Sequence, residues 1–376
     1  HGRLRSLTGA LEGMRIVGQI DGDGRLRYQP EAIQLDDIKL VGHAVQFHGY
    51  GLSVDEPALD LTTSGRWLTE KETLELQQTR LNCPTVTVQT PSLSVGMDQV
   101  GALQITTSAT VQGDVARLRR CLLSSPANTL ETLGGAFAGR IDLRPDDGRQ
   151  VLQLDLNVQN LAFGAPAAPV WREPRVHVTG HGVYDLLKDS FQIVHLYADS
   201  TTLNCDVAGQ ITAVSGDMEL SLEGKLSYDL EKLEPQLRPY LGSSVKLSGR
   251  DVRAFHIAGA LAAPVSTSPP SALLGRLRGE AGVNWQSLQA LGCQIGPAEV
   301  RGQWANGWFR AAPIEATLNQ GRLRLEPSLR LHPNPLEVHL AKGRAIDKAR
   351  LTPAACASGL GLSLIHISEP TRQAEI

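Results

Sequence analysis

The chain has 376 residues, of which 41% are hydrophobic and 20% charged, and its formal net charge is −3 at pH 7. This composition excludes a disordered tail and a membrane-embedded bundle, and the charge gives no support for nucleic-acid binding, which calls for a basic face. The 37 glycines and 21 prolines predict frequent turns between many strands. No stretch approaches the roughly 18 consecutive apolar residues of a membrane-spanning helix.

A first repeat unit is predicted over residues 1–145. Residues 20–26 read IDGDGRL, which lacks the third acidic ligand and the distal glutamate of a calcium loop, so a hairpin turn is predicted there. Residues 56–67 read EPALDLTTSGRW, in which polar and apolar residues alternate up to a glycine. Trp67 follows two places later and is predicted to be a packing residue.

Two short helices are predicted, one near 114–124 and one near 229–241. Each follows strand-like alternation, and each begins with an aspartate, Asp114 or Asp229. A carboxylate at this position suits an N-cap, because it accepts hydrogen bonds from the free backbone N–H groups of the first turn.

A second repeat unit is predicted over residues 146–262, and its start falls within a turn predicted at Pro145-Asp146-Asp147-Gly148. Residues 151–158 read VLQLDLNV, a strict alternation that places its apolar residues on one face of a strand. The predicted groove-lining residues of this strand are Leu152, Leu154, Leu156 and Val158.

The second unit contains an echo of the first. Residues 173–184 read EPRVHVTGHGVY, and their Glu-Pro start lies 117 positions after the earlier one (173 − 56). The apolar alternation in this segment adds Val176 and Val178 to the predicted groove. Leu-Asn-Cys closes both copies, at 81–83 and 203–205, which predicts five extra residues in the second copy.

A Pro/Ser-rich linker is predicted over 263–275, and a third β-repeat unit over 276–350. Asn306-Gly307 and Gln320-Gly321 are predicted hairpin turns within this unit. The strand after the second turn alternates again, and it contributes the last two groove candidates, Leu323 and Leu325.

The final residues, 363–376, read SLIHISEPTRQAEI and have no periodic relation to the preceding chain. This string resembles a translated sequencing adapter, so it is set aside as a non-native tail. The chain also begins at His1 rather than Met. We therefore expect a longer parent protein.

The repeated alternation predicts a mainly β fold in which one face of each strand is dry and the other is wet. In a compact sandwich the dry faces meet each other, whereas in an elongated, bent sheet they line a groove. Stacked repeats add length rather than a second core, which favours the elongated groove with short helices between repeats.

No catalytic, cofactor or metal site is predicted. His177 and His181 lie four apart on a predicted strand, roughly 13 Å from each other at about 3.3 Å per residue, which does not match the helical geometry of a zinc motif. The five cysteines lack zinc-finger spacing. They are predicted to be small buried thiols, with a Cys83–Cys205 disulfide as the alternative in an oxidising compartment.

The cycle of alternating strands, a D-L/V-x-x-L helix (Asp114–Leu118, Asp229–Leu233) and a glycine-containing return strand resembles the AsmA-like superfamily, which includes TamB- and YhdP-type proteins. The resemblance covers roughly residues 10–350. It implies a bent sheet with an apolar trough, located in the periplasm. In that family an N-terminal segment, which this sequence lacks, anchors the protein in the inner membrane.

The same resemblance implies a non-enzymatic role in phospholipid transfer between inner and outer membranes, or in outer-membrane assembly. The expected partners are phospholipid acyl chains, the inner membrane and outer-membrane assembly components, with no nucleic acid. One alternative is a structural or adhesive β-repeat protein of the cell envelope. A second alternative, a carbohydrate-active β-solenoid enzyme, is disfavoured because aromatic residues are only 5% of the chain.

Overall fold

The computed structural model describes residues 2–11, 14–49, 52–97, 101–122, 132–164, 171–216, 218–242, 244–261, 273–290, 292–330, 337–341 and 343–350. These residues form a mainly β protein of antiparallel strands with short helices, as the sequence predicts. The chain divides into two compact units. The first comprises His1–Gly224 with His256–Leu277, and the second comprises Lys225–Phe255 with the chain from Arg278 onward.

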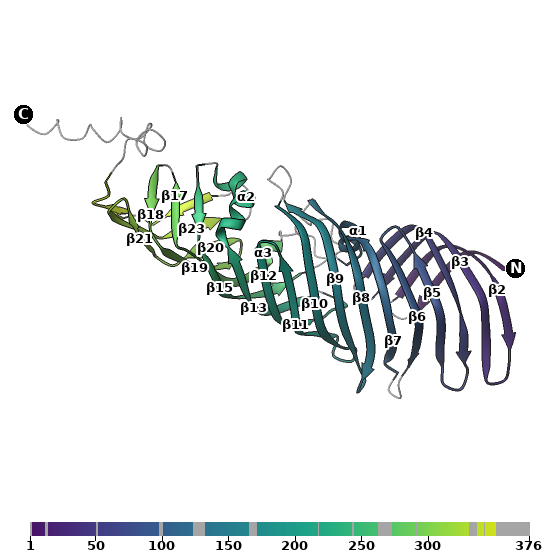
Figure 1. Cartoon of the computed structure of the whole chain (residues 1–376). Coiled ribbons are helices and arrows are strands. Elements are labelled where there is room, and N and C mark those ends of the chain that lie inside the picture. Colours follow the sequence, from purple (N-terminus) through teal and green to yellow (C-terminus); the bar gives the residue numbers. More distant parts are fainter. Residues whose placement is uncertain are drawn as a thin grey trace, which may run out of the picture. The chain divides into compact units, whose positions relative to one another are not determined.

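The first unit is a meander in which each strand pairs antiparallel with the next strand of the chain. Figure 1 shows β2 to β11 following one another side by side, from purple to teal. Short turns suffice for such antiparallel neighbours. The strands are β1 (Gly2–Leu11), β2 (Met14–Tyr28), β3 (Ala32–Gly49), β4 (Leu52–Leu68), β5 (Thr73–Asn82), β6 (Val86–Met97), β7 (Leu103–Asp114), β8 (Thr132–Asp146), β9 (Arg149–Gly164), β10 (Trp171–Asp185), β11 (Ser190–Ser200) and β12 (Leu203–Thr212).

Bulges bend these long strands without ending them. The β4–β5 pairing shifts register between Thr62 and Ser64, and Gln78 of β5 has a left-handed backbone there (φ 49°). The β2–β3 pairing shifts between Asp23 and Arg25. An extra residue in one strand of a pair bends that strand and increases its twist.

Strands β2–β6 and β8–β12 are two copies of one arrangement. The left-handed residues recur at corresponding places: Ala44 of β3 matches Asn160 of β9, and Glu72 in the β4–β5 turn matches Asp189 in the β10–β11 turn. The repeated sequence therefore encodes repeated backbone geometry.

The Leu-Asn-Cys echo does not mark corresponding positions, so the predicted five-residue insertion is wrong. The spacing of 117 runs unchanged through both hairpins, so Cys83 corresponds to Ser200 and Cys205 corresponds to Val88. Cys83 Sγ and Ser200 Oγ each donate to the carbonyl oxygen three residues later, at 3.2 and 3.0 Å.

Two helices begin at the predicted aspartates. Helix α1 (Val115–Leu122) follows Asp114, whose Oδ1 accepts from Arg117 N at 2.8 Å. Helix α2 (Leu230–Leu241) follows Asp229, which accepts from Glu231 N at 3.1 Å. Both carboxylates thus cap free N–H groups of the first turn.

The second unit has two sheets, and the chain alternates between them. One sheet pairs β16, β19, β20, β23 and β24, and the other pairs β14, β17, β18, β21, β22 and β25. The first sheet has β16 (Leu277–Trp285), β19 (Ala298–Ala305), β20 (Trp308–Ala311), β23 (Pro327–Arg330) and β24 (Glu337–Leu340). The second has β14 (Lys246–Ser248), β17 (Ser287–Ala290), β18 (Cys293–Ile295), β21 (Ile314–Leu318), β22 (Gly321–Leu325) and β25 (Ile346–Asp347). The remaining elements are β13 (Glu219–Asp229), β15 (Arg250–Ala260) and α3 (Leu273–Arg276).

From β16 to β23, each crossing between these two sheets is a corner of one or two residues, whereas five positions separate β24 from β25. The corners include Gln286, Gly296-Pro297 and Ala312-Pro313. Backbone hydrogen bonds continue through them, with Gln286 N donating to Ser248 O at 2.8 Å and Ala312 N donating to Arg301 O at 2.7 Å. The corners therefore redirect a strand without leaving its backbone groups unpaired.

The predicted turns meet different outcomes. The turn at Asn306-Gly307 is confirmed, and a turn is also confirmed within 145–148, where Asp147-Gly148 form the two-residue hairpin loop. The turn predicted at Gln320-Gly321 is wrong by one residue: Leu318 pairs with Gly321, so Asn319 and Gln320 form it. The turn predicted at 20–26 is also wrong, because these residues run through β2 and Gly24 sits at a bulge.

Two other predictions fall wholly or partly outside the described residues. The linker predicted over 263–275 falls mainly outside them, and its last three residues belong to α3. The tail at 363–376 lies outside them entirely.

Candidate functional site

A continuous row of apolar residues crosses the sheet of the first unit. Directly opposed residues of paired strands share a face, so the register of each pair extends the row to the next strand. We call this the central apolar row, and it runs from β2 to β12. Its members are Gly22, Leu40, Leu61, Leu81, Val88, Val111, Gly139, Leu156, Val178, Ala198 and Cys205.

A second row lies on the opposite face, and each of its members is a chain neighbour of an apolar-row residue. We call it the central polar row. Its members are Asp23, Lys39, Thr62, Arg80, Gln89, Thr110, Arg140, Asp155, Thr179, Tyr197 and Asp206. The sheet therefore has one apolar and one polar face across eleven successive strands.

The structure brings six of the predicted groove residues together on the apolar face. Leu156 is opposite Val178, and Val158 is opposite Val176. The other two, Leu152 and Leu154, are opposite glycines of β10 and the apolar residues Leu143 and Ile141 of β8.

Leu323 and Leu325 belong to the second unit. They lie in β22, opposite Ala316 and Ile314 of β21. A neighbouring apolar row in the same sheet consists of Leu247, Leu288, Ile295, Leu318 and Gly321. The second unit thus has an apolar face of its own.

The apolar face of the first unit is shielded but not sealed. Leu154, Leu156 and Val178 are half-buried, whereas Val176 is buried at 8% exposure. Helix α1 packs on this unit against β4 and β8. A sealed sandwich would bury the central residues of both layers fully.

Hydroxyl groups satisfy the backbone where bulges interrupt the apolar face. Thr90 is 6% exposed, and its hydroxyl donates to Ser92 O (2.7 Å) and lies 2.9 Å from Thr107 Oγ1. Thr63 and Thr79 form a similar pair at 2.7 Å. These threonines keep the bends compatible with burial, because carbonyl groups released by a bulge still find donors.

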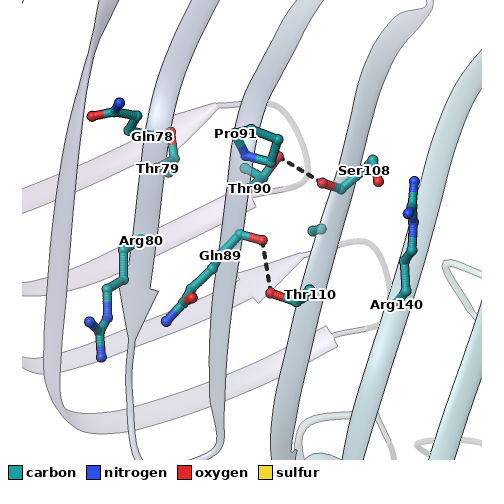
Figure 2. A pocket seen from close by; sticks show the side chains of 10 residues that line it. Gln78, Thr79, Arg80, Gln89, Thr90, Pro91, Ser108, Thr110 and Arg140 are labelled. Carbon is teal, nitrogen blue, oxygen red and sulfur yellow. Dashed lines mark hydrogen bonds between the residues drawn. The ribbon is translucent and has the colours of Figure 1, made fainter.

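The polar face has a depression of about 640 Å³, shown in Figure 2. Arg80, Gln89, Thr110 and Arg140 come to it from four neighbouring strands, with Gln89 and Thr110 between the two arginines. Arg140 Nε also pairs with Asp142 at 3.0 Å. The Ser108 hydroxyl and the Arg140 guanidinium hold the pKa of Asp142 below its usual value. The depression is therefore lined by charged and hydrogen-bonding side chains.

The second unit has a similar depression of about 600 Å³ on the polar side of its first sheet. Arg253, Arg301 and Arg310 line it, and Glu299 bridges the first two. Hydrogen bonds from Arg301, and the charge of Arg253, lower the pKa of Glu299.

The histidines do not form the metal pair that their spacing suggests. His177 Nε2 lies 2.8 Å from Asp155 Oδ1, whereas His181 is opposite His195. Across the described residues, no group of three or more His, Cys, Asp or Glu side chains is arranged to hold a metal ion. In the same part of the chain, no helix is long and apolar enough to cross a bilayer.

Trp67, the predicted packing residue, and Tyr184, its counterpart in the second copy 117 positions later, differ in burial. Tyr184 is half-buried and donates to Asp189 Oδ1 at 3.1 Å, whereas Trp67 is 36% exposed between Ile33 and Leu74. Cys83 lies in the β5–β6 turn and Cys205 in β12, and both are free thiols, so the structure does not pair them.

Sequence reasoning missed most members of the central apolar row, such as Leu40, Leu81 and Val88. Their local alternation was the available signal, but membership in a row depends on register.

Comparison with protein-family profiles, with curated proteins and with solved structures finds no match for this chain. Its function is therefore inferred from the contrast between the two faces of the sheet.

Proposed function

We propose that this chain is a segment of a periplasmic, AsmA-like envelope protein, and that its apolar face holds phospholipid acyl chains during transfer between inner and outer membranes. The observation that carries the proposal is the central apolar row, whose residues are half-buried except for the buried Val111. An apolar face that is shielded by curvature, yet still accessible, fits a flexible apolar ligand.

The energetics favour this use of the face. Exposing a methylene to water costs about 0.8 kcal/mol, so an acyl chain of about 16 carbons would need on the order of 10 kcal/mol to cross water unaided. A continuous apolar row offsets most of this cost at every step, while a charged head group stays hydrated. Such transfer needs no catalytic residue, cofactor or metal.

The resemblance to the AsmA-like superfamily supports the same proposal. It supplies the periplasmic location, the anchorage to the inner membrane and the link to outer-membrane assembly. The bent, repeated sheet is the fold that this resemblance implies. The structural or adhesive alternative requires instead that the apolar faces seal against one another.

The test uses charge placed on either face of one strand. Leu154→Asp/Leu156→Asp adds two carboxylates to the apolar face, and Gln153→Asp/Asn157→Asp adds two to the polar face of the same strand. Full-length wild type and both variants are purified from a bacterial periplasm, and bound lipid is quantified by mass spectrometry. Circular dichroism shows whether each variant keeps its β structure.

We expect near-stoichiometric phospholipid on the wild type and on the polar-face variant, and little on the apolar-face variant. A folded wild type without lipid would overturn the proposal in favour of the structural alternative. Equal lipid on both variants would overturn the assignment of this face.

A further inference from the structure

Two buried glutamates occupy the same position in the two copies of the repeat. Glu56 of β4 is 1% exposed and Glu173 of β10 is 3% exposed. The Glu173 carboxylate accepts from Trp171 Nε1 (3.0 Å), from the Thr201 hydroxyl (3.2 Å) and from the Thr202 hydroxyl. Its burial is therefore offset by three donors, as buried carboxylates require.

Glu56 has lost these donors. Val54 stands where the second copy has its tryptophan, and Pro84 stands where it has its first threonine. Thr85 matches the remaining threonine, but its side chain hydrogen-bonds the Cys121 thiol. Neither carboxylate oxygen of Glu56 receives a hydrogen bond of ordinary geometry, and the side chain that interacts with this carboxylate is the Cys83 thiol. The first copy thus keeps the buried carboxylate but has replaced or redirected each of the three donors that serve it in the second copy.

Two cysteines meet at Thr85. Cys83 Sγ donates to Val86 O at 3.2 Å, and the Thr85 backbone N–H also hydrogen-bonds this sulfur. Cys121 lies in the last turn of α1 and is 9% exposed. Asp114 N, at the start of α1, donates to Thr85 O at 3.2 Å. Thr85 therefore interacts with both cysteines, one in the β5–β6 turn and the other in α1.

We propose that Cys83 and Cys121 are a disulfide-forming pair, and that their oxidation fastens α1 to the β5–β6 turn. The second copy has no equivalent pair, because Ser200 and Gln236 occupy the corresponding positions. The redox device is therefore specific to one end of the repeat, where α1 packs against β4 and β8.

The oxidant is a small-molecule disulfide, and the exchange has two steps. The thiolate of Cys83, the half-buried member, attacks one sulfur of the small disulfide and releases the first small thiolate. The Cys121 thiolate then attacks Cys83 Sγ of the mixed disulfide and releases the second. The two protons lost from the cysteines are taken up by the two leaving thiolates, so one protein disulfide and two small thiols result.

The surroundings make this exchange slow. Burial raises the pKa of the Cys83 thiol, and the adjacent Glu56 charge raises it further against the backbone hydrogen bonds. Burial also raises the pKa of Cys121, where Glu56 acts in the same direction and Thr85 and Arg120 oppose it. Because the thiolate is the reacting species, the smaller thiolate fraction of both cysteines slows each exchange step.

The test treats the native full-length protein with oxidised glutathione, then alkylates and maps peptides by mass spectrometry. We expect a Cys83–Cys121 cross-linked peptide that is lighter by two hydrogens, and unchanged cross-linking in Cys205→Ser. Cys121→Ser is expected to leave a glutathione adduct on Cys83. Wild type in which both cysteines stay alkylatable, or in which Cys83 pairs with Cys205, would overturn the proposal without any variant.

A second measurement examines the role of Glu56. Glu56→Gln removes its charge, and we expect the cross-link to form several-fold faster. Asp55→Asn removes an equal charge from the exposed neighbouring position and is expected to leave the rate unchanged. Equal rates in wild type and both variants would contradict the effect assigned to Glu56.

Discussion

The two units bend their strands in different ways. In the first unit, strands of 10 to 18 residues stay continuous, and bulges at residues such as Gln78 bend them. In the second unit, strands break at corners such as Gly296-Pro297, and the two halves enter different sheets. The first arrangement preserves one unbroken apolar face over many strands, whereas the second produces two shorter sheets.

This difference predicts where each unit is sensitive to substitution. In a continuous sheet, two paired strands cannot separate locally, because each strand is also hydrogen-bonded to a neighbour on its other side. A strand broken at a corner transmits a local change over fewer residues. The following substitutions test this contrast, from the largest expected effect to the smallest.

The largest effect is expected at Gly139 in the central apolar row. A Cβ there would lie 2.0 Å from Asp155 O and 2.7 Å from Leu156 Cα, and both are backbone atoms that cannot rotate away. We expect Gly139→Ala to lower the free energy of unfolding by about 3 kcal/mol, measured as the urea midpoint. Gly134→Ala in the same strand meets no atom within 4 Å and serves as the control.

Gly302→Ala extends this test to the second unit. Its Cβ would meet the ring of Phe309, a side chain that can shift, so a smaller loss of about 1 kcal/mol is expected. A Gly302→Ala variant as unstable as Gly139→Ala would remove the proposed contrast between the units.

A moderate effect is expected at the hydroxyl groups that support the bulges. Thr90→Val keeps the shape of the side chain but leaves Ser92 O and Thr107 Oγ1 without this partner, so we expect a loss of about 2 kcal/mol. Thr110→Val removes one 3.3 Å bond at an exposed site, and a loss below about 0.5 kcal/mol is expected. Similar urea midpoints for the two variants would argue against a supporting role of the buried hydroxyl. Figure 2 shows both residues.

The smallest effect is expected from the ion pairs of the second unit. The pKa of Glu299 is lowered in the folded state, so its contribution to stability is present above the ordinary glutamate pKa and is lost as pH falls through the lowered one. Urea midpoints of wild type and Glu299→Gln should therefore differ slightly at pH 7 and converge in acid. A difference that grows in acid would contradict this sign. The effect is small because the partner Arg301 is mostly exposed.

The sequence predicts the strand class, the faces and the helix starts because these depend on local chemistry. Alternation predicts that Leu152, Leu154, Leu156 and Val158 share one face. Asp114 and Asp229 mark the N-caps of the two helices. Bulges escaped prediction, because Gln78 and Ala44 adopt left-handed backbones under tertiary control and not by intrinsic preference. Gln286 likewise gives no local sign that its strand changes sheets.

Most of the candidate site also lies beyond local prediction. Leu40 and Val88 join one row only because three intervening registers align them, and each register depends on turns and bulges. The loss of donors around Glu56 could not be seen in the Glu-Pro echo alone. It becomes visible when the donors around Glu173 are compared with the residues that replace them.

The repeat spacing has a consequence for how such a chain can grow. Successive residues of a strand point to opposite faces of the sheet. Inserting one residue therefore exchanges the polar-face and apolar-face positions for the rest of that strand. The copy at β8–β12 repeats the bulge of β2–β6 at Ala44 and Asn160, and the extra residue of β3 is absorbed by a further bulge between Leu35 and Ile38. Duplication of a whole repeat therefore lengthens the apolar row without a single compensating substitution, whereas change by single residues is confined to turns and bulges.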